Sequence, residues 1–252
     1  TANRIACWDG NQWNALGSGI SGIARSMLSL GGQLIAGGDF VQAGGMNMSR
    51  VAAWDGQSWS ALGAGFNSPV YSLVERNGVL FASGSFTQSG LATVNRLARW
   101  GGANWFSVAN DIASTIENIC VFNGDLIIGG SALHIPTVDG VPVSGVAKWD
   151  GDVWSRLGDG FNDYVLDIGK YRGDIVVTGK FQLPDPKSGT SRVARLTPTG
   201  WEPLGDGLSS TGSAITSFED DLIVGGSFQN SGTLPVNRIA RYDGESWNSI
   251  GS

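Results

Sequence analysis

The chain has 252 residues with 16 basic and 22 acidic side chains, a net charge of −6, and only 15% of its residues are charged. It contains 39 glycines, about twice the share of an average protein, and 10 tryptophans. This composition excludes a disordered chain and disfavours a helical enzyme, because it favours tight turns and short strands. Without a basic cluster, nucleic-acid binding is not expected. No apolar run reaches the roughly 18 residues of a membrane-spanning helix, so membrane insertion is not expected either.

The chain begins with a hairpin-like segment, residues 3–17, and continues with a complete set of four strand-like segments. The first two of these, strands a and b, are expected near Ser26 to Leu30 and from Leu34 to Gly38. Gly31-Gly32 forms the turn between them, and later copies of this turn read Asn-Gly, a favoured two-residue hairpin turn. Strands a and b are therefore predicted to form an antiparallel hairpin.

The next two segments form a second hairpin. Strand c is expected from Arg50 to Trp54 and strand d from Trp59 to Leu62, with Asp55-Gly56 in the turn. Because side chains alternate along a strand, Trp54 and Trp59 project from the same face of this hairpin. We therefore expect the two rings to cover one contact between neighbouring blades as a pair.

The aromatic-Asp-Gly and tryptophan motif recurs along the chain, in part in degraded form, with its first position at residues 8, 54, 100, 149, 196 and 242. A repeat of about 40 to 50 residues built from short strands is typical of a β-propeller blade. We therefore predict an all-β fold, a β-propeller of four-stranded antiparallel blades. All the tryptophans fall inside the motif and are interpreted as structural: Trp8, Trp13, Trp54, Trp59, Trp100, Trp105, Trp149, Trp154, Trp201 and Trp247.

The repeats divide the chain into five and a half units within a single propeller domain, residues 1–252. We predict five blades plus an extra N-terminal hairpin, because a blade without its two inner strands exposes unpaired backbone. The alternative is a six-bladed ring in which another segment or chain completes one blade. The half-repeat covers residues 1–19, and the full repeats cover about 20–65, 66–111, 112–160, 161–207 and 208–252.

A Gly-Gly pair ends strand b in several repeats, as in Gly37-Gly38 and Gly225-Gly226, and together with the motif that follows it resembles the kelch-type propeller repeat. More closely, the Asn-Arg-Ile-Ala…Asp-Gly…Trp pattern of residues 3–17 and 237–251 is similar to repeats of large bacterial secreted and surface proteins. The strand-c tyrosine of kelch repeats is kept only at Tyr242, so the resemblance implies no kelch partner. It implies the propeller fold. With only four lysines among the basic residues, we expect a secreted or cell-surface protein.

The longer connections of the repeats, from strand b to c and from strand d to the next strand a, are expected on one face of the propeller, called here the long-loop face. Variable loops on a rigid scaffold often carry binding sites, so a ligand is expected there. The third and fourth b–c connections, residues 131–145 and 180–191, differ most from the others. The candidate ligand-binding residues are Asp39, His134, Asp139, Asp159, Asp163, Asp185 and Asp206.

Residues 17–22 match the GxGxxG pattern of nucleotide-binding loops. The same Leu-Gly-x-Gly recurs after strand d at 62–65, 157–160 and 204–207 without a helical pattern behind it, so it is interpreted as turn chemistry between blades. No cofactor is therefore expected. No metal is expected either, because the aspartates lack the dense spacing of a calcium loop and His134 is the only histidine.

An arginine precedes strand c in most repeats. Five such cations would suit an anionic ligand, but the same position in nearly every blade favours a structural role, in which each arginine bonds carbonyls of its own b–c connection. The residues are Arg4, Arg50, Arg96, Arg192 and Arg238, with Gly145 in the remaining repeat.

The leading functional hypothesis is a non-enzymatic interaction or structural module that binds a protein through the long-loop face or assembles through its terminal half-repeat, including self-association. The second is a sugar-binding propeller with repeated sites between blades. Cys7-Trp8-Asp9-Gly10 with Trp13 resembles the repeat of fucose-binding propeller lectins, which implies a glycan partner, although the Arg and Glu of those lectins are absent. The third is a hydrolase or lyase that uses carboxylates in the central channel.

Overall fold

The computed structural model describes residues 2–131, 137–183 and 191–251, and these contain strands, turns and no helix. Accordingly, the described residues include no helix long and apolar enough to cross a membrane. The chain consists of two compact units, Thr1–Ile116 and Glu117–Ser252, called here unit 1 and unit 2. The expectation of a single domain stays a prediction.

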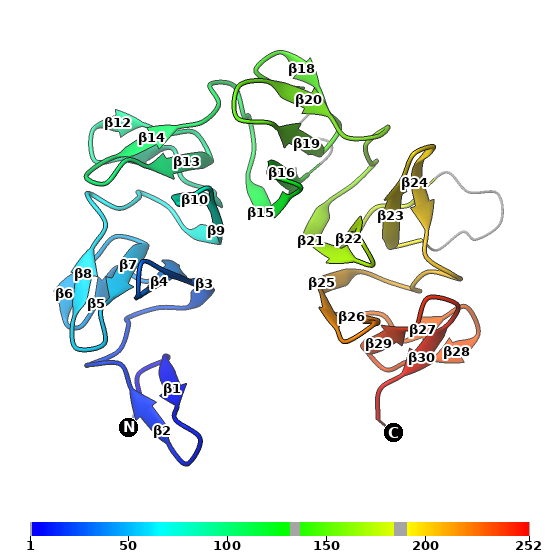
Figure 1. Cartoon of the computed structure of the whole chain (residues 1–252), viewed down its shortest axis with the longest axis horizontal. Coiled ribbons are helices and arrows are strands. Elements are labelled where there is room, and N and C mark those ends of the chain that lie inside the picture. The colour runs from blue at the N-terminus through cyan, green and yellow to red at the C-terminus, as the bar shows by residue number, and fades with distance from the viewer. Residues whose placement is uncertain (1, 132–136, 184–190, 252) are drawn as a thin grey trace. The chain divides into compact units, whose positions relative to one another are not determined.

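Unit 1 contains the N-terminal hairpin, β1 (Ala6–Trp8) with β2 (Trp13–Ala15), and two four-stranded antiparallel blades (Figure 1). Each blade has its strands in chain order from a to d. The first blade consists of β3 (Ala24–Leu30), β4 (Gln33–Gly38), β7 (Val51–Trp54) and β8 (Trp59–Ala61), and the second of β9 (Val70–Arg76), β10 (Val79–Gly84), β13 (Leu97–Trp100) and β14 (Trp105–Ser107).

Unit 2 contains three more blades, and the first strand of the first one begins at the boundary between the units. The third blade consists of β15 (Ile116–Phe122), β16 (Asp125–Gly130), β19 (Val146–Trp149) and β20 (Trp154–Arg156). The fourth consists of β21 (Val165–Tyr171), β22 (Asp174–Gly179), β23 (Val193–Thr197) and β24 (Gly200–Pro203), and the fifth of β25 (Gly212–Phe218), β26 (Asp221–Gly226), β29 (Ile239–Tyr242) and β30 (Trp247–Ser249).

These sheets confirm the prediction of a β-propeller with five four-stranded antiparallel blades and an additional N-terminal hairpin, within the residues described. The expected strands of the first blade match the observed ones to within two residues. The a–b turns have the left-handed backbone that the Gly-Gly and Asn-Gly pairs predict, with φ of 57° and 79° at Gly31 and Gly32 and 53° and 78° at Asn77 and Gly78.

Four of the b–c connections, which the sequence predicts as variable loops, contain a second, smaller hairpin. Glycines or Asp-Gly at their tips supply the left-handed residues that such a turn needs, for example Gly44 and Gly45 with φ of 61° and 81°. In the first repeat the d–a connection joins this hairpin, because Ile20 bridges Ala43. Four such pairs are described: β5 (Gln42–Ala43) with β6 (Met46–Asn47), β11 (Gln88–Ser89) with β12 (Ala92–Thr93), β17 (Thr137–Val138) with β18 (Val141–Pro142), and β27 (Asn230–Ser231) with β28 (Leu234–Pro235).

A buried phenylalanine follows the Gly that ends strand b, and the sequence analysis missed it. Phe86 has no exposed surface and stacks on Phe66 of the preceding d–a connection with ring centroids 4.0 Å apart. Phe66 in turn contacts Trp105 at 4.8 Å. In the sequence, this phenylalanine is marked by the spacing Gly-x-Phe at the end of strand b. The equivalent rings, all fully buried, are Phe40, Phe86, Phe181 and Phe228.

In four of the five blades, the tryptophan of strand d joins the blade to the repeat before it through a contact called here the Trp–Leu-Gly contact. Trp54 and Trp59 are direct cross-strand partners with ring centroids 5.4 Å apart. The Nε1–H of Trp59 donates to the carbonyl of Leu16 at 2.9 Å, and the pair lies over Gly17. A Cβ at Gly17 would stand 3.2 Å from the Trp54 ring, and its φ of 58° also suits glycine.

The same contact recurs within both units. Its hydrogen bonds join Trp105 to Leu62 at 3.0 Å, Trp201 to Leu157 at 3.0 Å, and Trp247 to Leu204 at 2.8 Å. In each case a left-handed glycine, Gly63, Gly158 or Gly205, follows the leucine and lies against the aromatic side chains. Trp154 does not make this bond, since its buried indole N–H has no partner among the described residues. The interpretation of Leu-Gly-x-Gly as turn chemistry between blades is therefore confirmed.

Removing the indole donor of a buried tryptophan should destabilise the protein. Trp105→Phe deprives the Leu62 carbonyl of its bond, which we expect to cost about 1–3 kcal/mol of unfolding free energy, measured by urea denaturation at low protein concentration. Trp13→Phe is the control, because Trp13 is 69% exposed and its change should stay within about 0.5 kcal/mol. An equal loss in both variants would contradict the assigned role of the bond.

Candidate functional site

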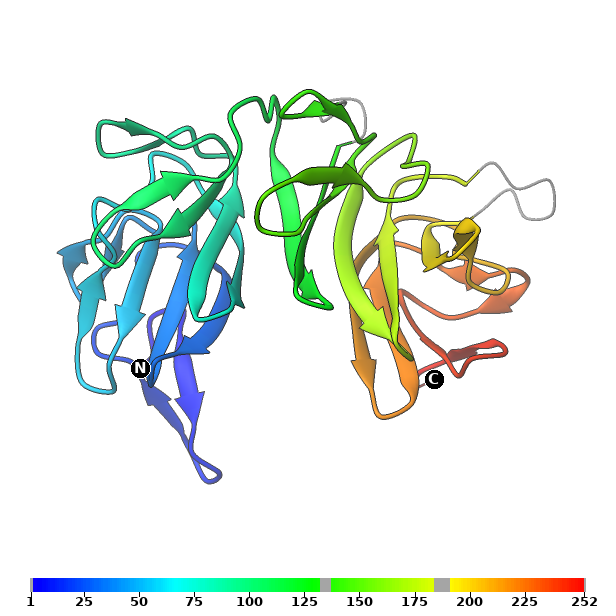
Figure 2. The same cartoon turned by 45° about the horizontal axis from the view of Figure 1, so that its top comes forward.

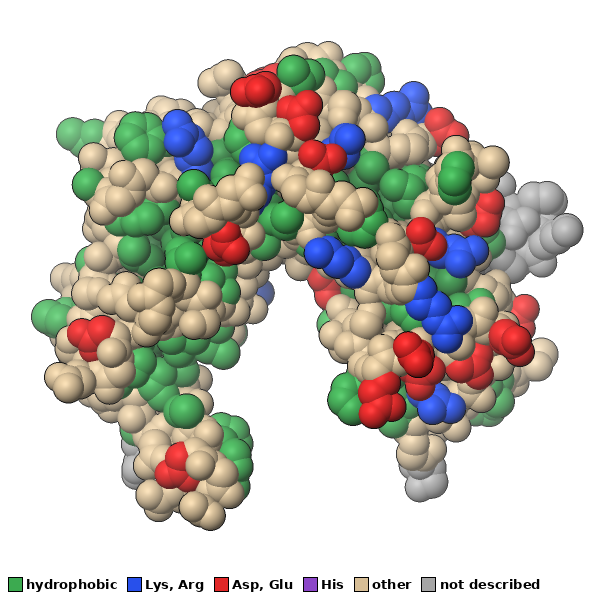
Figure 3. Space-filling view, in the orientation of Figure 1, with side chains coloured by type: hydrophobic (Ala, Val, Ile, Leu, Met, Phe, Trp, Pro, Cys, Tyr) green, Lys and Arg blue, Asp and Glu red, His purple; other side chains and the backbone are tan. Residues whose placement is uncertain are grey.

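The N-terminal hairpin carries the same tryptophan pair as the complete blades but leaves it exposed. Trp8 and Trp13 are cross-strand partners with ring centroids 5.6 Å apart, close to the 5.4 Å of Trp54 and Trp59. They are 49% and 69% exposed, whereas Trp59 is 3% exposed. Figure 2 shows the hairpin at the edge of unit 1, and Figure 3 shows apolar side chains on its surface. We call the exposed rings of Trp8 and Trp13 the hairpin face.

The hairpin is held firmly on the first blade. Ile5 and Leu16 are buried in the core of that blade, and the Leu16 carbonyl accepts the bond from Trp59. The backbone N–H of Ile20 also donates to the carbonyl of Asn3 at 3.2 Å. The exposed tryptophan pair therefore stands on a packed support rather than on a free segment.

Strand β1 has one edge without a neighbouring strand. In the blades strand c lies between strands b and d, but β1 pairs only with β2 among the described residues. The N–H of Asp9 points to β2, because it donates to the Gln12 carbonyl at 3.2 Å. Since N–H directions alternate along a strand, the N–H groups of Ala6 and Trp8 point to the free edge. This edge can accept a further strand.

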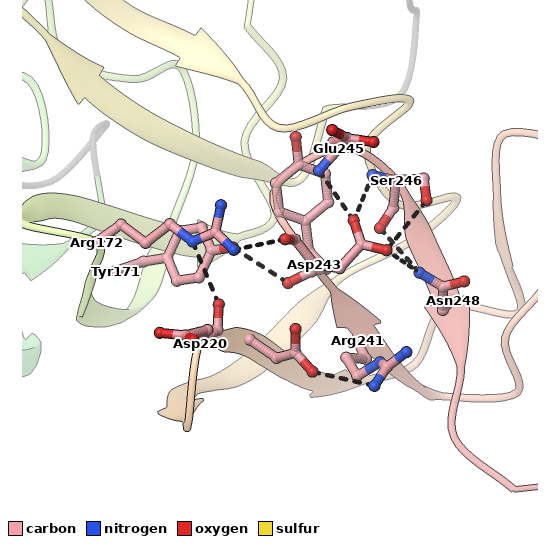
Figure 4. A network of polar contacts seen from close by, with 10 residues as sticks. Tyr171, Arg172, Asp220, Arg241, Asp243, Glu245, Ser246 and Asn248 are labelled. Atoms are coloured by element: carbon pink, nitrogen blue, oxygen red, sulfur yellow. Dashed lines mark hydrogen bonds and ion pairs between the residues drawn. The ribbon is translucent and has the colours of Figure 1, made fainter.

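In four of the c–d turns, counting that of the N-terminal hairpin, an aspartate carboxylate accepts backbone N–H groups of the turn. The Oδ1 atom of Asp243 accepts the backbone N–H groups of Glu245 and Ser246, both at 2.9 Å (Figure 4). These bonds stabilise the ionised carboxylate and lower its pKa to about 2, with the bond from Ser246 as the largest cause. Backbone bonds of the same kind lower the pKa of the equivalent carboxylates, Asp9, Asp55 and Asp150.

The turn of Asp243 is also tied to the fourth blade. Arg172, in the turn between β21 and β22, donates to the carbonyl of Asp243 at 2.6 Å and to that of Asp220 at 3.3 Å (Figure 4). The hydroxyl of Tyr171 donates to the Tyr242 carbonyl at 3.4 Å. The a–b turn of the fourth blade and the c–d turn of the fifth are thus held together by structural contacts.

The candidate residues of the long-loop face lie in separate repeats. Asp39 forms a two-pronged ion pair with Arg25, with bonds of 2.7 and 2.8 Å, so its carboxylate is engaged in structure. Asp139 stands at the tip of the β17–β18 hairpin with φ of 47°. The carboxylate of Asp206 lies close to Gly232 in the b–c connection of the fifth repeat. His134 and Asp185 lie outside the described residues.

Two of the candidate residues flank a cavity in unit 2. A cavity of about 470 Å³ lies between the d–a connection before the fourth blade and the start of its b–c connection. Asp159 lines it and pairs with Arg156 at 3.2 Å, and the half-buried Trp201 contributes an aromatic wall. Asp163 lies beside it and accepts the N–H of Tyr164 at 2.7 Å. The lining is Asp159, Gly160, Phe161, Asn162, Gln182, Leu183 and Trp201.

The described part of the chain contains no group of three or more His, Cys, Asp or Glu side chains that could hold a metal ion. Of the five candidate residues that the structure describes, Asp159 and Asp163 share one connection, and the other three lie in different repeats. The sequence did not reveal the exposure of Trp8 and Trp13, because their motif is the same as that of the buried tryptophan pairs.

Three of the five arginines before strand c behave as the structural interpretation predicts. Arg50 donates to the carbonyl of Asp39, Arg96 to that of Phe86 at 3.3 Å, and Arg192 to that of Lys180, each within its own b–c connection. Arg4 has no such connection in the half-repeat and donates to Ser21 of the next d–a connection instead.

Two half-buried titratable groups were not singled out in the sequence. Burial raises the pKa of Asp167, on strand β21, although its Oδ2 accepts the N–H of Ile215 at 2.8 Å in the fifth blade. Ser26 makes the equivalent bond to Leu73 at 3.0 Å, so this position joins neighbouring a strands. Burial also raises the pKa of the Cys120 thiol to about 12, which leaves it protonated at neutral pH.

No family model and no curated protein matches this sequence. Among solved structures, the chain is similar to YjhT, with 13% identity over 84% of this chain and 75% of that chain and a TM-score of 0.52. It is also similar to the computationally designed Ika8 protein, with 13% identity over 91% of this chain and 84% of that chain and a TM-score of 0.48. Both are propeller-type structures, and the likeness to YjhT supports the fold alone.

The lowered pKa values in the c–d turns predict a loss of stability in acid. Folded Asp243 stays ionised down to about pH 2, whereas an unfolded aspartate takes up its proton at about pH 3.9. The stabilisation is complete above about pH 4 and disappears as the pH falls towards 2. Asp243→Asn keeps an acceptor oxygen but cannot titrate, so its melting temperature should fall less than that of the wild type over this range.

Asp152→Asn is the matched control for this titration. Its backbone N–H and that of Val153 donate to Asp150, so the Asp152 carboxylate does not hold the turn. We expect this variant to keep the pH dependence of the wild type. Identical acid sensitivity of the wild type and the Asp243 variant would contradict the assigned role of this turn.

Proposed function

We propose that the chain is a non-enzymatic interaction or structural module of a secreted or cell-surface protein, and that it docks a partner on its N-terminal half-repeat. The observation that carries this proposal is that Trp8 and Trp13 are exposed, although tryptophan pairs of the same geometry are covered elsewhere in the chain. Kinship with kelch-type and bacterial surface repeats is part of the proposal and is supported by the repeated motif.

The hairpin face is suited to docking because its rings are already arranged for contact. Two tryptophan rings that bury the surface now exposed would contribute on the order of 5 kcal/mol of gross transfer free energy. Association costs roughly 4–15 kcal/mol, so the rings alone do not hold a partner. The free edge of β1 supplies the rest, since main-chain bonds to a docked strand add affinity and fix its register.

The first blade shows what this edge would accept. Strand β4 pairs with β7 so that Leu34 lies opposite Trp54 and Ala36 opposite Ala52. Trp8 and Ala6 hold the corresponding places in β1. A strand with the pattern of β4 would therefore match the half-repeat residue for residue.

A synthetic peptide with the sequence of residues 24–38 tests this docking. We expect saturable binding to the full chain and a shift of tryptophan emission, with binding at least about tenfold weaker for Ala6→Pro, which removes an edge donor without breaking a bond to β2. Ala2→Pro, outside the strand, should bind like the wild type.

A peptide methylated at the backbone nitrogens of Leu34 and Ala36 is the second control. The Gly38 N–H donates to Arg50 next to β7, so by alternation these two nitrogens also face strand c. We expect no binding of the methylated peptide. Equal binding of both peptides, or none of the unmodified one, would contradict docking at the β1 edge.

A second candidate function, sugar binding, is favoured by the cavity beside Trp201. An aromatic wall with Asn162 and Gln182 nearby offers a stacking face and hydrogen-bonding groups, which are the chemistry that a monosaccharide needs. The buried strand-d tryptophans, such as Trp59 and Trp105, offer no free ring face to a sugar. This proposal is therefore restricted to one cavity rather than to sites repeated between blades.

Titration with a panel of monosaccharides, fucose included, tests the second function. We expect saturable quenching of tryptophan emission that is lost in Trp201→Phe and kept in Trp8→Phe. Quenching that survives in the Trp201 variant, or emission insensitive to every sugar, would overturn sugar binding at this cavity.

A further inference from the structure

The Trp–Leu-Gly contact has two halves, and an exposed copy of each half lies near one end of the chain. Each of the four observed bonds joins a tryptophan to the carbonyl of a leucine 43 or 44 residues earlier. Trp8 and Trp13 form the aromatic half and are exposed. The other half is repeated at Ile250 and Gly251, which follow β30 as Leu16 and Gly17 follow β2.

Gly251 has the conformation of the glycines that carry an indole elsewhere. Its φ is 77°, in the same left-handed region as the 58° of Gly17 and the 60° of Gly63. A Cβ at Gly63 would stand 3.0 Å from the Trp100 ring, but a Cβ at Gly251 would meet nothing within 4 Å. Ile250 beside it is 41% exposed. The backbone of this half is thus formed, and its surface is open.

The blade around Gly251 exposes the remainder of the same contact surface. In the first blade, Leu30, Ile35 and Val51 pack into the core shared with the second blade. Phe218, Ile223 and Ile239 hold the corresponding places in β25, β26 and β29. Phe218 is 66% and Ile239 39% exposed. We call Phe218, Ile223, Ile239, Ile250 and Gly251 the fifth-blade face.

We propose that the hairpin face of one molecule binds the fifth-blade face of a second copy of this chain. Trp13 Nε1–H donates to the Ile250 carbonyl, and the rings of Trp8 and Trp13 cover Gly251. This inference rests on the proposed function, which makes the half-repeat a docking surface, and names the partner. The two surfaces differ, so the contact is heterologous, and copies join head to tail.

A second copy is favoured because the complementarity already exists in the chain. The contact is formed four times between neighbouring repeats, with the same donor, acceptor and left-handed glycine. An unrelated partner would have to reproduce that combination. Each joined copy leaves one hairpin face and one fifth-blade face at the two ends of the assembly, so growth continues until a ring closes or the copies are exhausted.

Two variants block one face each and test the pairing. Trp13→Glu places a charge in the hairpin face, at a side chain that is already exposed. Gly251→Asn fills the site of the indole, and asparagine tolerates the left-handed backbone. Gly31→Asn is the matched control, because Gly31 also has a positive φ and open surroundings but lies in an a–b turn.

Sedimentation velocity over a range of concentrations gives the readout. The wild type and Gly31→Asn should exceed the 26.3 kDa of one chain as concentration rises, whereas Trp13→Glu and Gly251→Asn should each stay monomeric. An equimolar mixture of the two blocked variants should form a complex of twice that mass and nothing larger, because each supplies the face that the other lacks.

Three results would overturn the inference: a wild type that stays monomeric, a blocked variant that assembles alone, or a mixture that forms no dimer. A monomer whose Trp13 is shielded from acrylamide would mean that the hairpin face is covered within one molecule. The peptide of residues 24–38 separates this failure from that of the proposed function. If the peptide binds Gly251→Asn although the wild type does not self-associate, the half-repeat still docks a partner, but that partner is not a second copy. If neither peptide binding nor self-association is observed, both proposals are wrong.

Discussion

The hydrogen bond from a strand-d indole to the carbonyl of a Leu-Gly turn holds neighbouring repeats of this protein together. The carbonyl sits at the end of a strand, where no ladder partner is available, and the indole both satisfies it and covers it with apolar surface. The glycine beside it is required because a side chain would meet the ring. Since each repeat contacts mainly its neighbours, this bond ties four of the blades to the repeat before them, whereas Trp154 of the third blade does not form it.

Several polar groups that recur in the repeats have structural partners. The turn aspartates accept backbone N–H groups, Arg50, Arg96 and Arg192 hold their b–c connections, and Asp39 is paired with Arg25. A repeated residue is therefore a poor guide to a binding site in this chain. The surfaces that remain available for recognition are the hairpin, the outer surface of the fifth blade, and the cavity beside Trp201.

Much of the architecture was predictable because it follows from local rules. The period of the motif gave the repeat, Gly-Gly and Asn-Gly gave the a–b turns, and strand alternation put Trp54 and Trp59 on one face. The candidate carboxylates were harder to place. Whether an aspartate such as Asp39 is free or paired depends on an arginine on another strand, and the sequence does not show that distance.

The sequence by itself determined the all-β repeat, its strand order and the structural role of its glycines, since these depend on residues close together in the chain. Only the tertiary structure decided which tryptophan pairs are buried. Trp8 with Trp13 and Trp54 with Trp59 have the same motif and the same ring geometry. One pair lies on a Leu-Gly turn and the other does not, because burial depends on what stands opposite a surface and not on the residues that form it.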